Sequence, residues 1–185
     1  MQLFIDTNIL LSFYSLNQED LSELNKLIDA IKRQQITLLL TDQIIDEFNR
    51  NREQRIDGAI KSLRNQTFNP QFPQLCEDYP EVDTLRESLK HYEQAHATLI
   101  NKILTDIKSK TLKADRIIQS LFSLGKKLTG NSTILDRARL RMAVGNPPGK
   151  NNSLGDAINW ECSLYETPAG KDLFFITRDR EYSSA

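Results

Sequence analysis

Short apolar runs alternate with amphipathic segments along much of the chain. The runs Leu3–Ile5 and Ile36–Thr41 are continuous, which is typical of strands covered on both faces of a parallel sheet. Between them, Glu19–Arg33 has leucines and isoleucines three and four residues apart, as in a helix with one apolar face. Helices are also predicted after each run, beginning at Asn8 and at Asp42 as an N-cap. This order predicts an α/β fold with a parallel sheet.

The middle of the chain departs from this order. Three prolines predict a loop over Asn69–Pro80, and Glu81–Lys127 then has the pattern of one or two long polar helices. The apolar residues that give those helices a seam are Leu85, Leu89, Tyr92, Leu99, Ile103, Leu104 and Ile107. We interpret Glu81–Lys127 as a helical insertion in, or cap on, a single domain that spans residues 1–185.

Further elements are predicted after this insertion. Ser132–Ala143 is helical in pattern, Gly145–Gly155 is a Gly/Pro-rich loop, and a helix follows from Asp156. The apolar run Leu173–Thr177 predicts a third buried strand. Because a doubly wound sheet normally adds another helix and strand here, we regard the chain as compatible with the N-terminal part of a longer protein.

Composition narrows the class of protein. The 185 residues suffice for one well-packed domain, and 24 Lys+Arg against 25 Asp+Glu leave a net charge of −1, so any basic surface must be local. No apolar run is long enough for a membrane span or a signal peptide. The two cysteines are too far apart in the sequence for a CxxC pair or a disulfide framework. We therefore expect a soluble, cytoplasmic protein with reduced thiols.

Four carboxylates lie where an α/β fold gathers its ligands. Asp6 ends the first strand, Glu47 lies on the helix after the second, Asp156 opens a late helix, and Asp179 follows the last strand. Ligands bind at the carboxyl ends of parallel strands, near the reversal of strand order, so neighbouring strands would bring these side chains to one rim. Repulsion between like charges is the chemical argument that such a shared site binds a cation. Carboxylates within ~4–6 Å of one another cannot all stay ionised unless a cation neutralises them.

Each acid also has a structural explanation of its own. Asp6 suits an Asx-turn or helix cap, and Glu47 suits an exposed helix position. Asp156 suits a capping box, and Asp179 an ordinary turn. Taken together and in this order, the four favour a shared site. Asp46 is the second choice for the position that we assign to Glu47.

An all-oxygen set of ligands selects a hard cation. No His or Cys accompanies these acids, so Mg²⁺ or Mn²⁺ is expected. Two such ions ~3.5–4 Å apart can activate a water molecule and stabilise the leaving oxygen of a phosphodiester. The residues therefore predict hydrolysis of a nucleic-acid backbone.

The motifs that carry the acids resemble the PIN-domain nuclease family. They are IDTNILL with Asp6, TDQIIDEF with Glu47, LGDAINWE with Asp156 and FFITRDREY with Asp179. The resemblance extends from Ile5 to Tyr182, and GNPPGK before the third motif is similar to a PIN-like subgroup with a long helical insertion. It implies a three-layer PIN-like fold, in which helices flank a central parallel sheet, and a divalent-metal-dependent endoribonuclease that cuts single-stranded RNA.

The resemblance also implies roles for individual residues. The four acids would be both catalytic and metal-binding, holding Mg²⁺ or Mn²⁺, with Asn8 and Thr177 in support through hydrogen bonds. Toxin-like members of the family imply an inhibitor protein as a partner, and dimers are common in such families. Neither feature is carried by a motif in this sequence, so both are expectations from the resemblance alone.

Basic and aromatic residues near the acids suggest further contacts. Arg137 and Arg141 share a helix face and, with Lys150, are candidates to hold phosphates, although a solvated face explains the two arginines equally well. Trp160 suits packing better than stacking on a base, and Glu161 suits an exposed helix position better than a metal ligand.

Two other functions compete with a nuclease. A catalytically silent PIN-like module would bind RNA or protein without cutting, but it has no physical need for clustered negative charge. A phosphatase of the haloacid-dehalogenase type also has an acid after its first strand. That chemistry requires a second acid two residues later, where this chain has Asn8.

Overall fold

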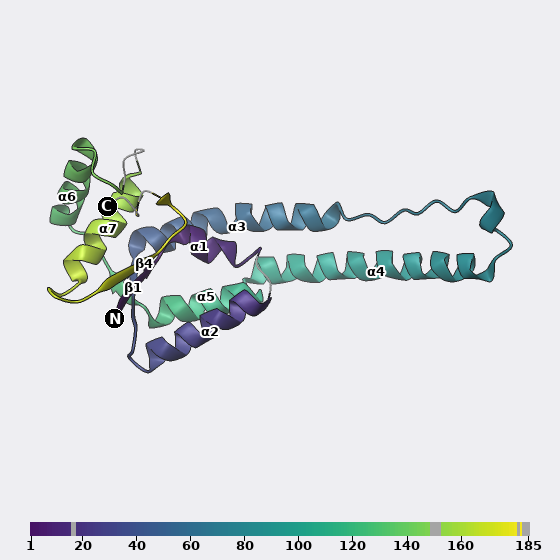
Figure 1. Ribbon diagram of the computed structural model, residues 1–185, viewed down its shortest axis with the longest axis horizontal. Coiled ribbons are helices and arrows are strands. Elements are labelled where there is room, and N and C mark those ends of the chain that lie inside the picture. The colour runs from purple at the N-terminus through teal and green to yellow at the C-terminus, as the bar shows by residue number, and fades with distance from the viewer. Residues whose placement is uncertain (16–17, 149–152, 181, 183–185) are drawn as a thin grey trace.

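A computed structural model describes residues 1–15, 18–148, 153–180 and 182, which form a body with a long arm (Figure 1). Lys150 therefore lies outside the described residues. In chain order the elements are β1 (Gln2–Ile5), α1 (Thr7–Ser12), α2 (Gln18–Lys32), β2 (Thr37–Thr41), α3 (Asp42–Arg64), a 3₁₀ turn (Gln74–Cys76), α4 (Pro80–Ser109), α5 (Lys113–Leu124), β3 (Lys126–Leu128), α6 (Ser132–Ala143), α7 (Leu154–Glu166) and β4 (Leu173–Ile176).

The described part of the chain contains one sheet of four parallel strands in the order β3-β2-β1-β4. The chain moves outward from β1 to β2 and β3, and then returns to the other side of β1 as β4. The strand order thus reverses between β1 and β4, where the carboxyl ends of strands leave a crevice for ligands. The predicted α/β fold with a central parallel sheet is confirmed.

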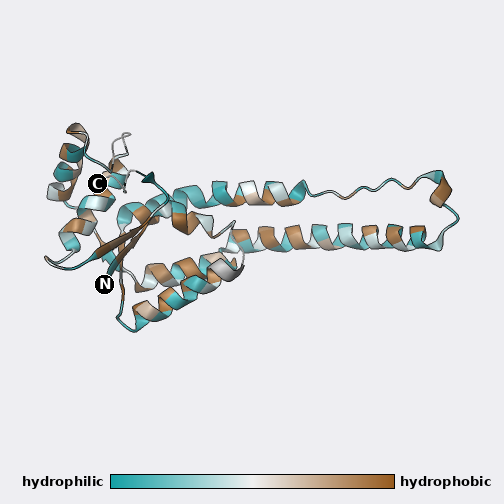
Figure 2. Ribbon diagram, in the orientation of Figure 1, coloured by the Kyte–Doolittle hydropathy of each residue, from teal (hydrophilic) through white to brown (hydrophobic). Residues whose placement is uncertain are grey.

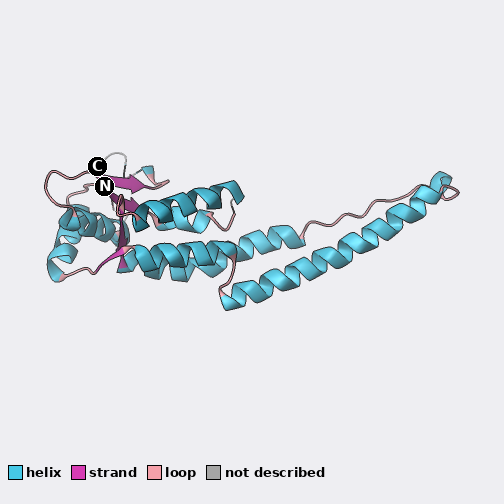
Figure 3. Cartoon of the chain, turned by 90° about the horizontal axis from the view of Figure 1, so that it is seen from below, coloured by secondary structure: helices cyan, strands magenta, loops and turns pink. Residues whose placement is uncertain are grey.

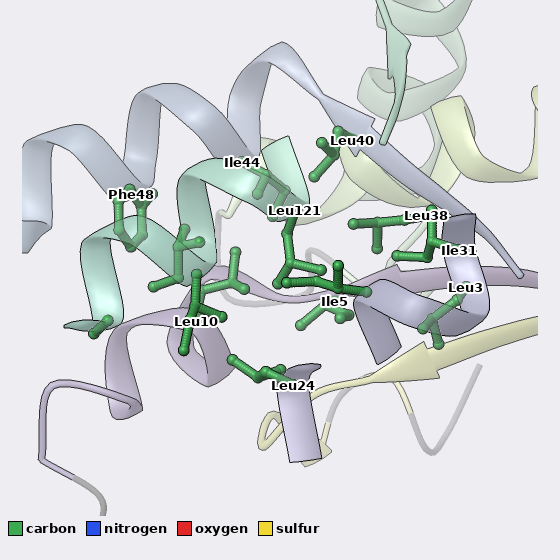
Figure 4. Packing of buried hydrophobic residues seen from close by; sticks show 14 of the residues in the cluster. Leu3, Ile5, Leu10, Leu24, Ile31, Leu38, Leu40, Ile44, Phe48 and Leu121 are labelled. Atoms are coloured by element: carbon green, nitrogen blue, oxygen red, sulfur yellow. The ribbon is translucent and has the colours of Figure 1, made fainter. Parts of the chain in front are cut away.

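Helices cover both faces of the sheet. Leu38 and Leu40 of β2 belong to a cluster with Leu121 of α5, which includes the apolar face of α2 (Figure 4). Leu39, between them, belongs to a second cluster with Ile134 of α6 and Cys162 of α7. Successive side chains of a strand point to opposite faces, so this short run serves two apolar layers.

The structure differs from the predicted extent of the helical insertion. α5 lies in the body, where Ile118 and Leu121 are buried, and the edge strand Lys126–Leu128 begins inside the range predicted to be helical. The predicted helical range Glu81–Lys127 thus divides into α4, the body helix α5 and the first two residues of β3. α4 instead runs outward from the body, which contains the sheet and the other helices. Together with the outer part of α3 and the segment between these two helices, α4 forms the arm (Figures 1 and 3).

Two local predictions also need correction. The N-cap of α3 is Thr41, whose Oγ1 accepts a hydrogen bond from the Ile44 amide, and Asp42 is the first helical residue. β4 is the fourth strand, and it is not buried on both faces, because it lies at the edge of the sheet with Phe174 and Ile176 exposed.

The arm is tied to the body by a buried ion pair. Arg52 of α3 donates from Nε and Nη2 to the Asp115 carboxylate of α5, at 2.7 and 2.6 Å, and Tyr14 Oη donates to the same carboxylate at 2.5 Å. Burial alone would raise the pKa of Asp115, but the hydrogen bonds from Arg52 and Tyr14 outweigh it and hold that pKa below its ordinary value. Arg52 also reaches the carbonyl of Ile107 near the end of α4.

Beyond this junction the arm is mostly exposed. Apolar residues recur along α4 (Figure 2), yet α4, all of which the structure describes, buries only Val82. No described helix combines the length and the apolar character needed to cross a membrane.

Candidate active site

Asp6 lies at the carboxyl end of β1, inside the crevice. It stands at the N-cap of α1 without a side-chain cap bond, and its Oδ2 accepts a hydrogen bond of 2.6 Å from Thr177 Oγ1. Thr177 Oγ1 in turn accepts from the Asp179 amide at 2.9 Å. The pairing of β1 with β4 therefore joins the first and fourth motifs. Burial raises the pKa of Asp6, the Thr177 hydrogen bond opposes this, and the charge of Asp156 adds to it.

Glu47 reaches the same crevice from the second turn of α3. It is half-buried, and its Oε2 accepts a hydrogen bond from Thr7 Oγ1 at 3.3 Å. Burial raises the pKa of Glu47, and the charges of Asp6 and Asp156 raise it further. Asp46 is exposed. Of these two neighbouring acids, Glu47 is the one that faces the other carboxylates.

Asp156 enters from the first turn of α7. Its backbone amide donates to Ser153 Oγ, so the helix cap is supplied by Ser153. Its carboxylate accepts a hydrogen bond of 3.2 Å from Tyr182 Oη. Burial raises the pKa of Tyr182, and the charges of Asp156, Asp6 and Asp179 all act in the same direction. The Tyr182 hydroxyl thus lies among three of the predicted acids.

The structure therefore brings all four acids to one rim of the sheet. Each of three carboxylates is turned to its own hydroxyl donor, Thr177, Thr7 or Tyr182. With these side-chain positions, no three His, Cys, Asp or Glu residues among those described form a group that could hold a metal ion. The charges of the acids act on one another, but their carboxylate oxygens do not converge on one point.

The atoms at the rim nevertheless suit a hard divalent cation. The donors are carboxylate oxygens, and Asn8 Oδ1 is buried with no hydrogen-bond partner among the described residues. A buried acceptor without a donor is costly, and a cation is one group that would satisfy it. The residues that could hold a cation, once their side chains turned toward a common point, are Asp6, Glu47, Asp156, Asp179 and Asn8.

Tyr182 is the site residue that the sequence analysis did not identify. Its ring stacks on Phe175 at 5.4 Å and lies 6.0 Å from Trp160, which confirms that Trp160 packs in the fold. The position three residues after Asp179, at the end of the fourth motif, was the available signal. It does not reveal that the hydroxyl turns back to α7.

The predicted phosphate contacts differ in their surroundings. Arg137 is exposed on α6. Arg141 donates from Nε to Glu161 Oε1 at 2.8 Å and from Nη1 to the Pro147 carbonyl at 2.6 Å. Glu161 is consequently buried, and its predicted exposure is wrong, because the ion pair with a neighbouring helix was not visible in the sequence.

A groove that includes Glu47, but none of the other three acids, runs along α3. It has a volume of about 940 Å³, lies between α1 and α3, and includes Asn8 and Glu47 in its lining. Farther along α3 it is lined by Asn51, Gln54 and Arg55. These polar residues recur three and four positions apart, so they share one helix face. That spacing could have been read from the sequence but was not.

Comparison with known proteins places this geometry in a family. No curated protein and no solved structure matches the chain. The family described as PIN domain matches residues 3–182, which include β1, β4 and all four acids of the rim. The chain therefore belongs to the PIN domain family, whose members are generally metal-dependent nucleases.

Proposed function

We propose that this chain is a divalent-metal-dependent endonuclease that hydrolyses phosphodiester bonds in single-stranded RNA. The observation that carries the proposal is the meeting of Asp6, Glu47 and Asp156 at the reversal of the strand order, where burial and the charge of Asp156 raise the pKa of both Asp6 and Glu47. A fold gains nothing from burying like charges together, so such an arrangement indicates a functional site.

The rim residues have distinct tasks in this proposal. Asp6, Glu47, Asp156 and Asp179 hold Mg²⁺ or Mn²⁺, which supplies a Lewis acid for the phosphate and lowers the pKa of a water molecule. Thr177 orients Asp6, and Thr7 orients Glu47, through the hydrogen bonds described above. Tyr182 orients Asp156 in the same way.

The groove along α3 is the proposed path of the RNA strand. Its polar lining offers the amides of Asn51 and Gln54 and the guanidinium of Arg55, groups that contact phosphates and sugars without reading sequence. A flexible single strand can follow such a helix face away from the cleavage site. Arg137 is a further candidate for a phosphate contact, because it is exposed.

The test is cleavage of a labelled circular RNA without base-paired regions, in Mn²⁺ and in EDTA. A circle has no ends, so its linearisation reports an internal cut. We expect Asp6→Asn and Asp156→Asn each to reduce the rate by more than about 100-fold, since even residues that only support metal ligands cost 10–100-fold. Asp46→Asn is the matched control, because Asp46 is exposed beside Glu47, and should retain the activity.

Two results would contradict the proposal. Cleavage that is unchanged in both Asp6→Asn and Asp156→Asn would assign the activity to other residues or to a contaminant. Metal-independent RNA binding, with no cleavage in any divalent ion, would favour the catalytically silent module instead.

A further inference from the structure

Helix α4 carries an exposed apolar stripe. Leu85, Tyr92 and Leu99 are spaced seven residues apart and retain 50%, 43% and 48% of their accessible surface. Residues at this spacing lie on nearly the same face of a helix. The stripe therefore runs along the arm without being covered by the described residues.

The neighbouring flank of α4 is already in use within the chain. Leu89, His96 and Ile103 are half-buried, and His96 Nε2 lies 3.0 Å from the carbonyl oxygen of Leu63 in α3. The two flanks together repeat every three and four residues, which is the spacing of a coiled-coil seam. The flank with Leu89, His96 and Ile103 is thus partly covered within the chain, whereas the flank with the exposed stripe is not covered by the described residues.

The open side has a self-complementary order of residues. Reading from the tip toward the body, it consists of exposed side chains spaced alternately four and three apart: Glu81, Leu85, Ser88, Tyr92, Ala95, Leu99 and Lys102. When a second copy runs in the opposite direction, Leu85 lies opposite the partner's Leu99. Tyr92 then lies opposite the partner's Tyr92, and the small Ser88 lies within one residue of the position opposite the partner's small Ala95.

Charge decides between the two directions. Residues 80–94 contain four acids and two bases, whereas residues 95–110 contain one acid and three bases. Antiparallel copies place the acidic half on the basic half, with Glu81 opposite Lys102, and also oppose the helix dipoles. Parallel copies in register would place like charges together.

We propose that α4 is a homodimerisation surface, on which a second copy of this chain packs antiparallel about a two-fold axis at Tyr92. The stripe from Glu81 to Lys102 is about 32 Å long at 1.5 Å per residue. In this arrangement the tip of each arm lies beside the body-proximal end of the partner's α4. The exposed Leu75 and Tyr79 at the tip gain a surface to contact there.

The first experiment measures the mass of the full chain in solution. Sedimentation equilibrium over a dilution series should show a dimer that dissociates reversibly. Tyr92→Glu places two charges at the two-fold axis and should weaken the dimer by about 100-fold, as expected for the centre of an interface. Asn101→Glu, which adds the same charge on the opposite face of α4, should leave the dissociation constant unchanged. Circular dichroism should show equal helix content in both variants, since both positions are exposed.

A charge exchange tests the direction of pairing. Glu81→Lys and Lys102→Glu should each weaken the dimer, and the double variant should restore it, because the opposite charges face each other again. Three results would overturn the proposal. They are a monomer across the dilution series, a dimer that Tyr92→Glu leaves intact, and a double variant weaker than either single one. A monomer that assembles only when RNA is added would indicate that the stripe serves nucleic-acid binding instead.

Discussion

The body and the arm contain helices of similar design, but only the body covers their apolar faces. α5 has twelve residues, five of which are buried, and it packs against α2 and β2. α4 has thirty residues, all described, and buries one. Both helices are amphipathic, but α5 has the more sharply separated apolar face, and α5 is the one that packs against α2 and the sheet. An apolar stripe indicates that a helix packs against a partner. Whether that partner belongs to the same chain depends on the rest of the fold.

Ion pairs provide the sharpest way to test this contrast. Arg52–Asp115 is buried at the base of the arm, whereas Arg86–Asp83 is exposed on α4. We expect Asp115→Ala to lower the free energy of unfolding by about 3–5 kcal/mol, because it leaves the Arg52 charge buried without its partner. Asp83→Ala should cost about 0.5 kcal/mol or less. Urea denaturation of both variants measures the two values.

The buried pair also predicts a pH dependence. The pKa of Asp115 is held below its ordinary value, so the pair contributes its full stability above the unfolded-state pKa of about 3.9. This contribution is lost as the pH falls through the lower, folded-state pKa. Asp115→Ala should therefore flatten the acid limb of the stability curve, and equal acid limbs would contradict the assignment.

Apolar truncations give the next largest effect. Leu121 on α5 is fully buried, and Leu75 at the tip of the arm is largely exposed. Leu121→Ala should cost about 2–5 kcal/mol, because it removes buried methyl groups and leaves a cavity. Leu75→Ala should stay within about 0.5 kcal/mol. Similar losses from both variants would show that the tip is covered as well as the body.

The same contrast explains which parts of the fold the sequence could predict. The runs Leu3–Ile5 and Ile36–Thr41 predicted central strands, and the acids that follow strands were correctly expected at one edge, because these are local properties of the chain. β3 was missed, since its three residues include two lysines and only Leu128 is buried. α5 was grouped with α4 because two amphipathic helices in succession look alike until their neighbours are known.

Contacts between segments that are distant in the sequence could also not be predicted from it. From its spacing to Arg137, Arg141 was a candidate either for a phosphate contact or for a solvated helix face, and the sequence did not reveal that its guanidinium pairs with Glu161 on the next helix. Tyr182 became a site residue only when β4 brought the fourth motif beside α7. Four-residue spacings reveal what shares a helix face, whereas the partner across a helix interface depends on tertiary packing.

The smallest predicted effect concerns the acidic rim, where the charge of Asp156 acts unfavourably on the buried Asp6 carboxylate. In EDTA, Asp6→Asn should raise the free energy of unfolding by about 1 kcal/mol, because it removes a charge beside Asp156 and keeps an acceptor for Thr177. The direction of this change follows from the raised pKa of Asp6. Without metal, the free energy of unfolding of the wild type falls as the pH rises from the unfolded-state pKa of about 3.9 through the higher, folded-state pKa.

Thermal unfolding at two metal concentrations completes this test. Mn²⁺ should stabilise the wild-type chain, because a ligand that binds only the folded state adds to its stability. In Mn²⁺ the wild type should therefore be more stable than Asp6→Asn, the reverse of the order in EDTA. Asp46→Asn is the control, since Asp46 is exposed and should follow the wild type in both conditions. If Asp6→Asn were less stable than the wild type in EDTA, the Asp6 carboxylate would be a structural acceptor.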